Sequence, residues 1–166
     1  MTQAMDAAAG QRSGQAQDEF RLGLAFMKNR QWKTAVRHFR IADDRCPRRD
    51  ARACLYRSYH GLALVSCGEV SGLNLCRSAA SQEKSRADVF HNLALAEIRL
   101  KHRRRACDAI AAGLSIDPRN TPLLALRNRL GTRRKPCVPF LNRNNPLNKW
   151  LGKVTYRSVR RRAAMC

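Results

Sequence analysis

The sequence predicts an all-α protein built as a stack of helical hairpins. No stretch alternates apolar and polar residues over six positions, and no Asn-Gly or Asp-Gly turn occurs, so strand signals are absent. Apolar residues instead recur at helical spacing through most of the chain. A third observation is a repeat, because residues 35–47 (AVRHFRIADDRCP) and 106–118 (ACDAIAAGLSIDP) share one pattern of small, apolar and proline positions, 71 residues apart.

The first hairpin is predicted from two periodic segments that flank the polar turn KNRQ. Residues 19–29 carry apolar or small side chains on most sides of a helix, which indicates a helix that is packed on several sides. Residues 32–44 form an amphipathic helix with a basic stripe at i, i+4 and i+7. Its apolar side is formed by Trp32, Ala35, Val36, Phe39, Ile41 and Ala42, and the stripe by Lys33, Arg37 and Arg40.

The following elements repeat this unit and then close it. A middle hairpin is predicted over 53–67 and 70–80, with Gly68 in its turn, and a third over 87–100 and 105–116. Local signals mark two helix starts and one helix end. They are a capping box formed by Ser85 and Asp88, a cap at Thr121 with Pro122 at the first helical position, and a stop at Gly131 after a helix that runs to about Leu130.

Alignment on the small residues gives windows 16–49, 53–86 and 87–120, each of 34 residues, with three extra residues after the first. A helix–turn–helix unit with a period of 34 is typical of tetratricopeptide repeats. The family pattern is matched by Leu22, Gly23, Phe26, Ala35, Phe39, Ala42 and Pro47 in the first window, and by Phe90, Leu93, Ala94, Ala106, Ile110, Gly113 and Pro118 in the third. The middle window matches more weakly, through Tyr56, Tyr59, His60, Ala63, Gly72, Cys76 and Ala79.

The chain therefore resembles tetratricopeptide-repeat proteins over about residues 16–131. The resemblance implies an α-solenoid of three helical hairpins with a capping helix over 121–131. We expect residues 1–15 to be a disordered N-terminus and residues 132–166 to be a basic, partly irregular tail.

The resemblance also implies a concave groove lined by the first helix of each repeat, which would bind a peptide or helix of a partner protein. The expected groove residues are mostly apolar: Phe20, Leu24, Met27, Arg57, Leu64, His91, Leu95 and Ile98. Relatives that grip the C-terminal carboxylate of chaperones use lysine, asparagine and arginine at set groove positions. Those positions hold Phe20, Leu24, Ser58, Asp88 and Asn92 here, which predicts against a chaperone-tail adaptor.

The tail carries ten lysines and arginines and no acidic residue. Two of its clusters are expected to contact an anionic partner: Arg133, Arg134 and Lys135, and Arg160, Arg161 and Arg162. Its large apolar residues include Phe140, Trp150 and Leu151. Two interpretations stay open for them, namely docking on the domain of the same chain and a linear motif recognised by another protein.

The whole chain has 33 basic and 12 acidic residues, a net charge of +21. This predicts nucleic acid, anionic lipid or an acidic protein face as partner, although a basic solvated surface explains the charge equally well. No apolar run is long enough for a signal-peptide core or a transmembrane segment. The seven cysteines, mostly inside apolar helical patterns, predict a reducing, cytoplasmic location.

No catalytic or metal-binding constellation is recognisable, so we expect no enzyme activity, no metal and no cofactor. There is no Cys-x-x-Cys, no pair of histidines on one helical face and no phosphate-binding glycine loop. The favoured function is a protein-interaction scaffold. The alternative is nucleic-acid or ribosome association through the tail, and a third hypothesis, a secretion chaperone, fits the basic charge poorly.

Overall fold

The structure is a computed structural model that describes residues 2–47, 50–131, 145–146 and 150–151. It divides into two compact units, Met1–Leu130 and Gly131–Cys166, and the first unit holds seven α-helices. The described residues contain no strand, so the predicted all-α class is confirmed. The helices are α1 (Thr2–Lys28), α2 (Trp32–Arg45), α3 (Ala53–Ser66), α4 (Gly72–Gln82), α5 (Ala87–Arg99), α6 (Arg103–Ile116) and α7 (Thr121–Leu130).

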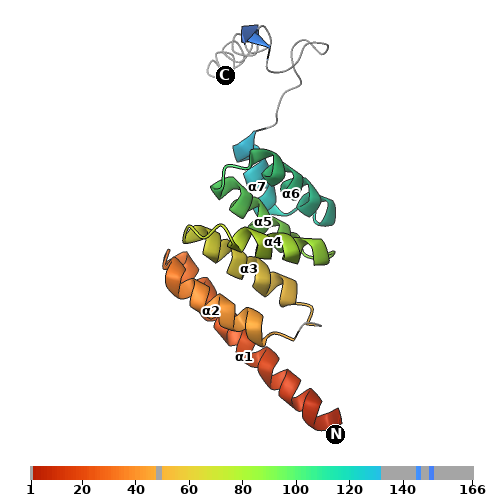
Figure 1. The fold of residues 1–166 in the computed structure, drawn as a ribbon. Coiled ribbons are helices and arrows are strands. Elements are labelled where there is room, and N and C mark those ends of the chain that lie inside the picture. The colour runs from red at the N-terminus through yellow and green to blue at the C-terminus, as the bar shows by residue number, and fades with distance from the viewer. Residues whose placement is uncertain (1, 48–49, 132–144, 147–149, 152–166) are drawn as a thin grey trace. The chain divides into compact units, whose positions relative to one another are not determined.

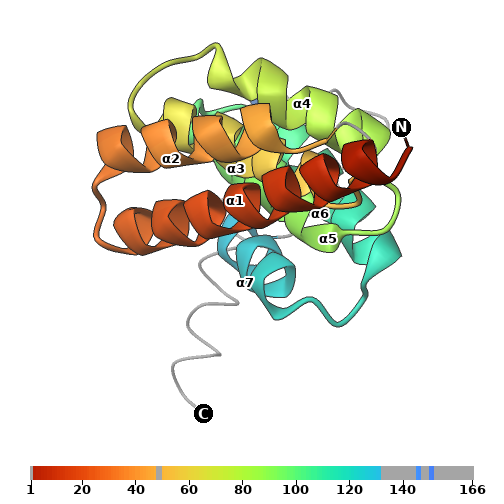
Figure 2. The same cartoon turned by 90° about the horizontal axis from the view of Figure 1, so that it is seen from below.

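The helices of the first unit form three antiparallel hairpins that stack in sequence order. Helices α1 and α2, α3 and α4, and α5 and α6 pair with each other, and α7 packs on α6 after the last hairpin (Figures 1 and 2). The first helices of neighbouring hairpins also contact each other, since α3 touches α5. This is the predicted solenoid of three hairpins with a capping helix. No described helix combines the length and the apolar character that crossing a bilayer requires.

The N-terminal segment differs from the prediction, because α1 begins at Thr2 and residues 2–15 are helical. The segment is rich in alanine, which has the highest helix propensity, and it contains no proline. Tertiary contacts also hold its C-terminal part. Ala16 is fully buried, and the Ser13 hydroxyl donates a 2.9 Å hydrogen bond to the Asp50 carboxylate. Apolar periodicity, the signal used to place the first helix, is weak in this alanine-rich stretch.

Small residues lie where the two helices of a hairpin approach most closely. A Cβ atom added to Gly23 would lie 2.6 Å from the ring of Phe39 on α2, and one added to Gly113 would lie 3.0 Å from the Cβ of Phe90 on α5. Ala35 and Ala42 on α2 are fully buried. These are positions that the repeat pattern marks as small, and larger side chains would push the helices apart.

The middle hairpin is offset by one residue from the predicted window. Gly61, and not His60, takes the small position of its first helix, because a Cβ at Gly61 would lie 2.5 Å from the Gly72 carbonyl oxygen and 2.8 Å from Cys76 Sγ. The equivalent small residues are 12 apart in the outer hairpins but 11 apart between Gly61 and Gly72. The side chains of α3 are therefore rotated by one position, about 100° around the helix axis, from the expected arrangement.

Two predicted glycine positions have the expected backbone. Gly68 has φ +95° two residues after the end of α3, and Gly131 has φ +70° directly after α7. Both lie in the left-handed region, which glycine enters without a Cβ clash and which commonly ends a helix. The predicted stop at Gly131 is confirmed.

Both predicted N-terminal caps are wrong. Helix α7 is capped by Asn120, whose side-chain oxygen accepts a 3.1 Å hydrogen bond from the Leu123 N–H, while Thr121 is already inside the helix. Helix α5 starts after Arg86 with no side-chain cap, and the Ser85 hydroxyl donates instead to Glu83. Several polar residues precede each helix. The sequence pattern alone does not show which of them accepts a hydrogen bond from a backbone N–H of the first turn.

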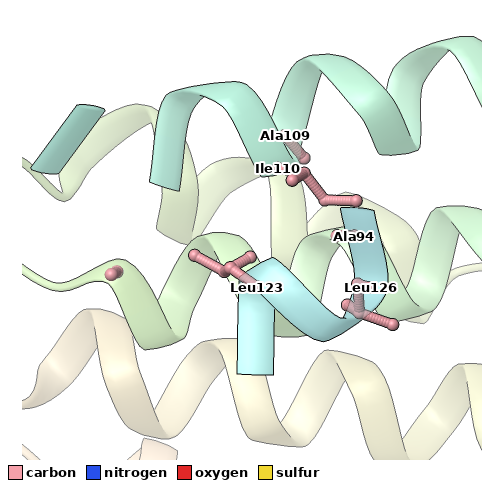
Figure 3. Close-up of a cluster of buried hydrophobic side chains, with 6 residues drawn as sticks. Ala94, Ala109, Ile110, Leu123 and Leu126 are labelled. Carbon is pink, nitrogen blue, oxygen red and sulfur yellow. The ribbon is translucent and has the colours of Figure 1, made fainter. Parts of the chain in front are cut away.

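The last hairpin and α7 share one apolar cluster. Leu123 of α7 is fully buried and Leu126 nearly so, and both lie near α5 and α6 in Figure 3. Without α7, this apolar surface of α5 and α6 would face water, so the helix closes the C-terminal end of the stack.

Candidate protein-binding surface

The first helices of the three hairpins present one set of side chains away from the second helices. On α3 the other sides are occupied: His60 contacts Asp43 of α2, Gly61 approaches α4, and Ser58 bonds to Asn92 of α5. The remaining side of α3 carries residues at the spacing i, i+4, i+7 and i+11. This side, together with the equivalent sides of α1 and α5, is called the inner face below. Its positions are occupied by Gln17, Arg21, Leu24 and Lys28; Leu55, Tyr59, Leu62 and Ser66; and Asp88, Asn92, Leu95 and Arg99. Leu62 and Asn92 are buried between the helices, and Tyr59 also packs against Phe39 of α2.

Two of the predicted groove residues, Leu24 and Leu95, belong to this inner face. Both are half-buried, and Leu95 shares its side of α5 with Asp88 and Arg99, which are exposed. Leu24 and Met27 both pack against the cluster around Phe39, and Leu95 and Ile98 both pack against the cluster that α7 closes. All four side chains therefore also stabilise the stack.

Phe20, also predicted to line the groove, is part of an aromatic cluster between the first two hairpins. Its ring centroid lies 5.6 Å from that of Phe39, 4.6 Å from that of Tyr56 and 5.1 Å from that of Tyr59, the last in an edge-to-face arrangement. Such pairs add stability beyond the buried area. A substitution of Phe20 would therefore test packing before it tests partner binding.

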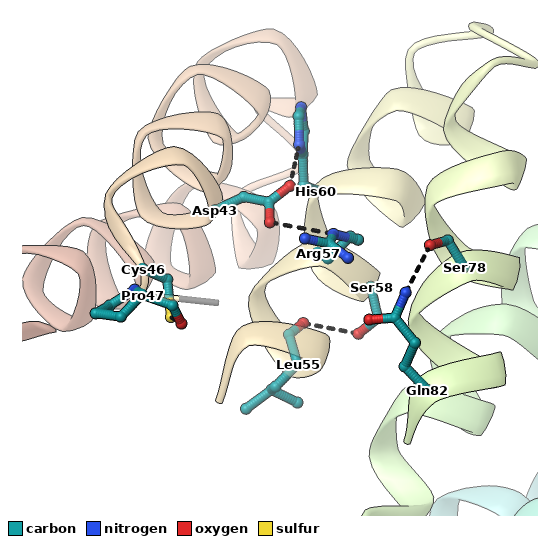
Figure 4. Close-up of polar contacts among 9 residues, drawn as sticks. All are labelled: Asp43, Cys46, Pro47, Leu55, Arg57, Ser58, His60, Ser78 and Gln82. Atoms are coloured by element: carbon teal, nitrogen blue, oxygen red, sulfur yellow. Dashed lines mark hydrogen bonds and ion pairs between the residues drawn. The ribbon is translucent and has the colours of Figure 1, made fainter. Parts of the chain in front are cut away.

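The structure does not bring Arg57 and Leu64 to the inner face, which corrects the prediction for the middle hairpin. The Arg57 Nε lies 3.5 Å from an oxygen of Asp43 on α2 (Figure 4). Leu64 faces α4, since a Cβ added to Gly72 would lie 2.6 Å from its own Cβ. The cause is the one-residue offset of α3. Because of it, Leu55 and Tyr59 occupy positions of the inner face that the prediction gave to other residues of α3.

A polar centre lies where α3 meets α5. The Asn92 amide donates a 2.9 Å hydrogen bond to the Ser58 hydroxyl, which itself donates to the Leu55 carbonyl, and Ser58 and Asn92 are both buried. Burial lowers the pKa of His91, against the opposing effects of Asp88 and of a hydrogen bond to Asn92. The His91 imidazole is therefore neutral at pH 7 and can offer a hydrogen bond to a partner without carrying charge.

Burial likewise raises the pKa of the Tyr59 phenol, and the Asp88 carboxylate raises it further. The phenol therefore stays protonated at neutral pH and keeps its O–H as a donor. Asp88 thus acts on both His91 and Tyr59, and it is exposed. The inner face combines mostly half-buried apolar side chains with a few neutral hydrogen-bonding groups, the exposed acid Asp88 and the exposed basic residues Arg21, Lys28 and Arg99.

Two carboxylates with little exposure to solvent join neighbouring hairpins. Asp43 of α2 contacts Arg57 and His60 of α3, with 3.2 Å to the His60 Nδ1 (Figure 4). Glu97 of α5 is 1% exposed. It accepts hydrogen bonds of 3.0 and 2.7 Å from Arg77 of α4 and one of 2.7 Å involving His102. These groups are fully engaged within the fold.

A pocket of about 440 Å³ lies at the hairpin-turn end of the stack. It is formed by the α1–α2 turn, the start of α2 and the end of α3, and its lining contains basic side chains but no acid. The guanidinium of Arg99, on the inner face of α5, lies 5.0 Å from the ring centroid of Trp32, a cation–π contact. The lining residues are Arg30, Gln31, Trp32, Lys33, Thr34, Ser66 and Cys67.

The predicted tail sites fall mostly outside the described residues, which applies to Arg133, Arg134, Lys135, Phe140, Arg160, Arg161 and Arg162. Of the remaining two, Trp150 is 62% exposed and Leu151 is half-buried, and both belong to the second compact unit.

Among the described residues, no group of three or more His, Cys, Asp or Glu side chains could hold a metal ion. The described cysteines are free thiols. Burial, followed by the charges of Asp50 and Asp43, raises the pKa of Cys46 to about 11, and burial raises that of Cys76 to about 12. Both thiols therefore stay protonated and unreactive at neutral pH.

Sequence reasoning missed Tyr59, Leu55 and Arg99 as members of the inner face. The signal that could have placed Arg99 is its spacing of four residues from Leu95, which puts both on one side of α5. Leu55 and Tyr59 required the position of Gly61 against α4, and that follows only from the packed hairpin.

Comparison with solved structures identifies the fold. The TPR domain of Arabidopsis OM64 matches with a TM-score of 0.58 and 18% identity, covering 72% of this chain and 96% of that domain. The first TPR domain of human RPAP3 matches with a TM-score of 0.58 and 14% identity, covering 70% and 89%. The second TPR domain of human RPAP3, solved in complex with the HSP70 peptide SGPTIEEVD, matches with a TM-score of 0.57 and 14% identity, covering 75% and 99%.

The sequence comparisons add no relative, since no protein-family model and no curated protein matches the chain. The structural matches show that this chain has the fold of a tetratricopeptide-repeat solenoid, as the 34-residue period predicts.

Proposed function

We propose that this chain, which has the tetratricopeptide-repeat fold, is a non-catalytic module that binds a peptide or helix of another protein along its inner face. The observation that carries the proposal is the pairing of Leu24 and Leu95 at equivalent places on α1 and α5, half-buried and flanked by exposed polar side chains. An apolar centre with a polar rim is the usual composition of a protein-binding surface.

The fold neighbours support the general role. Domains of RPAP3 are solved with HSP90 and HSP70 peptides, so the same stack of hairpins presents a peptide-binding surface in those proteins. We do not propose the same peptides as ligands here, because Ser58 and Asn92 are buried against each other and Leu24 is apolar. An acidic chaperone tail would find few free cationic or amide groups at these positions.

The proposed function requires no catalytic reaction. The carboxylates of Asp43 and Glu97 are held by arginine and histidine partners, and the burial that lowers the pKa of His91 keeps its imidazole neutral. Free, protonated thiols at Cys46 and Cys76 support a reducing compartment, and we propose the cytoplasm.

The test is affinity capture of partners with mass spectrometry, using the wild type and the double variant Leu24→Glu/Leu95→Glu, with circular dichroism to check that the variant keeps its helical fold, because both leucines also pack against the core. The matched control is Leu22→Glu, because Leu22 is 47% exposed on another side of the same helix α1. We expect partners that are captured by the wild type and by the control but lost with the double variant. If the double variant keeps the same partners at the same yield, the inner face is not the binding site.

A further inference from the structure

The positive charge of this chain is concentrated toward its C-terminal end. Residues 99–166 contain 18 of the 33 lysines and arginines but only two of the 12 acids, a net charge of +16 out of +21. Part of this block belongs to the folded stack, in α6 and α7.

The first turn of α6 and the last turn of α7 form one basic surface. Helix α6 opens with three consecutive arginines, Arg103 to Arg105, and α7 ends with Arg127 and Arg129 in its last turn. The Arg103 guanidinium donates a hydrogen bond to the Leu130 carbonyl, which places the two turns against each other. The exposed residues Arg104, Arg105, Arg127 and Arg129 are called the basic end below.

The four arginines of the basic end are not held by polar contacts within the described part of the chain. None of them makes an ion pair or a hydrogen bond to another residue of the described chain, whereas Arg57 and Arg77 are paired with acids. Arg104 and Arg105 also lie in the first turn of a helix, where the helix dipole disfavours positive charge. Helix stability therefore does not explain their presence.

The surroundings of the basic end favour one class of anion. Protein interfaces usually have an apolar centre, and helices that bind membranes insert an apolar face. The large exposed apolar residues of the described chain are Leu22, Val70 and Trp150, and none of them lies on α6 or α7. A surface of unpaired arginines without apolar neighbours is suited to phosphate groups, which guanidinium binds in bidentate geometry.

We propose that the basic end of the folded stack binds the phosphate backbone of a nucleic acid. The site goes beyond the proposed protein-binding role, because it uses α6 and α7 and none of the inner-face residues. Contacts to phosphates alone carry no base readout, so binding is expected to be independent of sequence.

The test measures fluorescence anisotropy of a labelled single-stranded RNA of about 20 nucleotides, with the full chain and over a series of salt concentrations. The patch variant is Arg104→Gln/Arg105→Gln/Arg127→Gln/Arg129→Gln. The control variant, Arg12→Gln/Lys33→Gln/Arg37→Gln/Arg40→Gln, removes the same charge from exposed residues of α1 and α2. Circular dichroism is used to check that both variants keep the helical fold.

In a plot of the logarithm of the binding constant against the logarithm of the salt concentration, the slope should be less steep by about three for the patch variant. Each lost phosphate contact is expected to reduce this slope by slightly less than one. Its affinity near physiological salt should fall at least about tenfold below that of the control variant. If the patch variant unfolds, Arg104→Gln/Arg105→Gln alone should give about half the change in slope.

Three results would overturn the proposal. The wild type fails to bind RNA at low salt, or the patch and control variants bind with equal affinity and slope. The third is a competition in which poly-L-glutamate or phosphatidylserine vesicles displace the RNA as well as unlabelled RNA does at equal charge. That result would assign the surface to acidic proteins or to membranes instead.

Discussion

Replacing Gly61 by alanine should loosen the middle hairpin, although alanine is the better helix former. The added Cβ would lie 2.5 Å from the Gly72 carbonyl oxygen and 2.9 Å from the Cys76 backbone nitrogen. Ordinary contacts of this kind are longer by about 1 Å. Two of the atoms that would be displaced belong to the backbone of α4, so no side-chain rotation can relieve the clash, and α3 and α4 must separate.

The magnitude follows from two opposed effects. Overpacking against a backbone costs about 3 kcal/mol, the upper end for an added methyl group. The gain in helix propensity from glycine to alanine offsets about 1 kcal/mol. The net loss is about 2 kcal/mol, which corresponds to a fall in the melting temperature of about 8 °C for a domain of this size.

Gly14→Ala provides the matched control, because Gly14 lies in α1 and a Cβ there would meet nothing within 4 Å. It should raise stability by up to about 1 kcal/mol. Both variants are measured by urea and thermal unfolding followed by circular dichroism at the helix signal. If Gly61→Ala proves as stable as Gly14→Ala, the close approach of α3 and α4 and the one-residue offset are both wrong.

Three further predictions concern buried and terminal charges. Glu97→Gln should destabilise the stack by about 1–2 kcal/mol in urea unfolding, because Arg77 loses its anionic partner. The loss is limited because Arg77 is 39% exposed and can be hydrated instead. Unchanged stability would contradict the buried pairing. The folded-state pKa of His91 is lowered, so its neutral form is favoured and stability is lost as pH falls below the ordinary pKa of histidine. His91→Gln should therefore lose less stability than the wild type between about pH 7.5 and about pH 5.5, and equal losses would argue against the burial of this ring. Arg104→Glu should raise the free energy of unfolding by up to about 1 kcal/mol, and with it the thermal midpoint, because negative charge at the start of α6 is favoured by the helix dipole. A lower midpoint would show that Arg104 has a structural partner.

The hairpins could be predicted from the sequence because their signal is local and repeated. Small residues such as Gly23 and Ala35 recur at fixed spacing, and each hairpin buries them for the same steric reason. The turn at Gly68 and the stop at Gly131 were likewise predictable, because both need a backbone that glycine adopts easily.

The details of the inner face could not be predicted in the same way. The alignment assumed the same spacing between the small residues of every hairpin. In the middle hairpin this spacing is one residue shorter, so α3 is rotated and Arg57 faces Asp43. Glu97 stands where the family pattern has an aromatic residue, and nothing local indicates that Arg77, twenty residues earlier, would reach it. Such pairs depend on how separate hairpins meet.

Both junctions between hairpins are crossed by an acid–arginine pair: Asp43 with Arg57, and Glu97 with Arg77. Detaching an end hairpin would therefore leave a carboxylate and a guanidinium without their counterions, in addition to uncovering apolar side chains. Partial opening is thus penalised at either end, and the three units should melt together as one cooperative block. Amide hydrogen exchange would report this as closely similar protection in α2, α3 and α5.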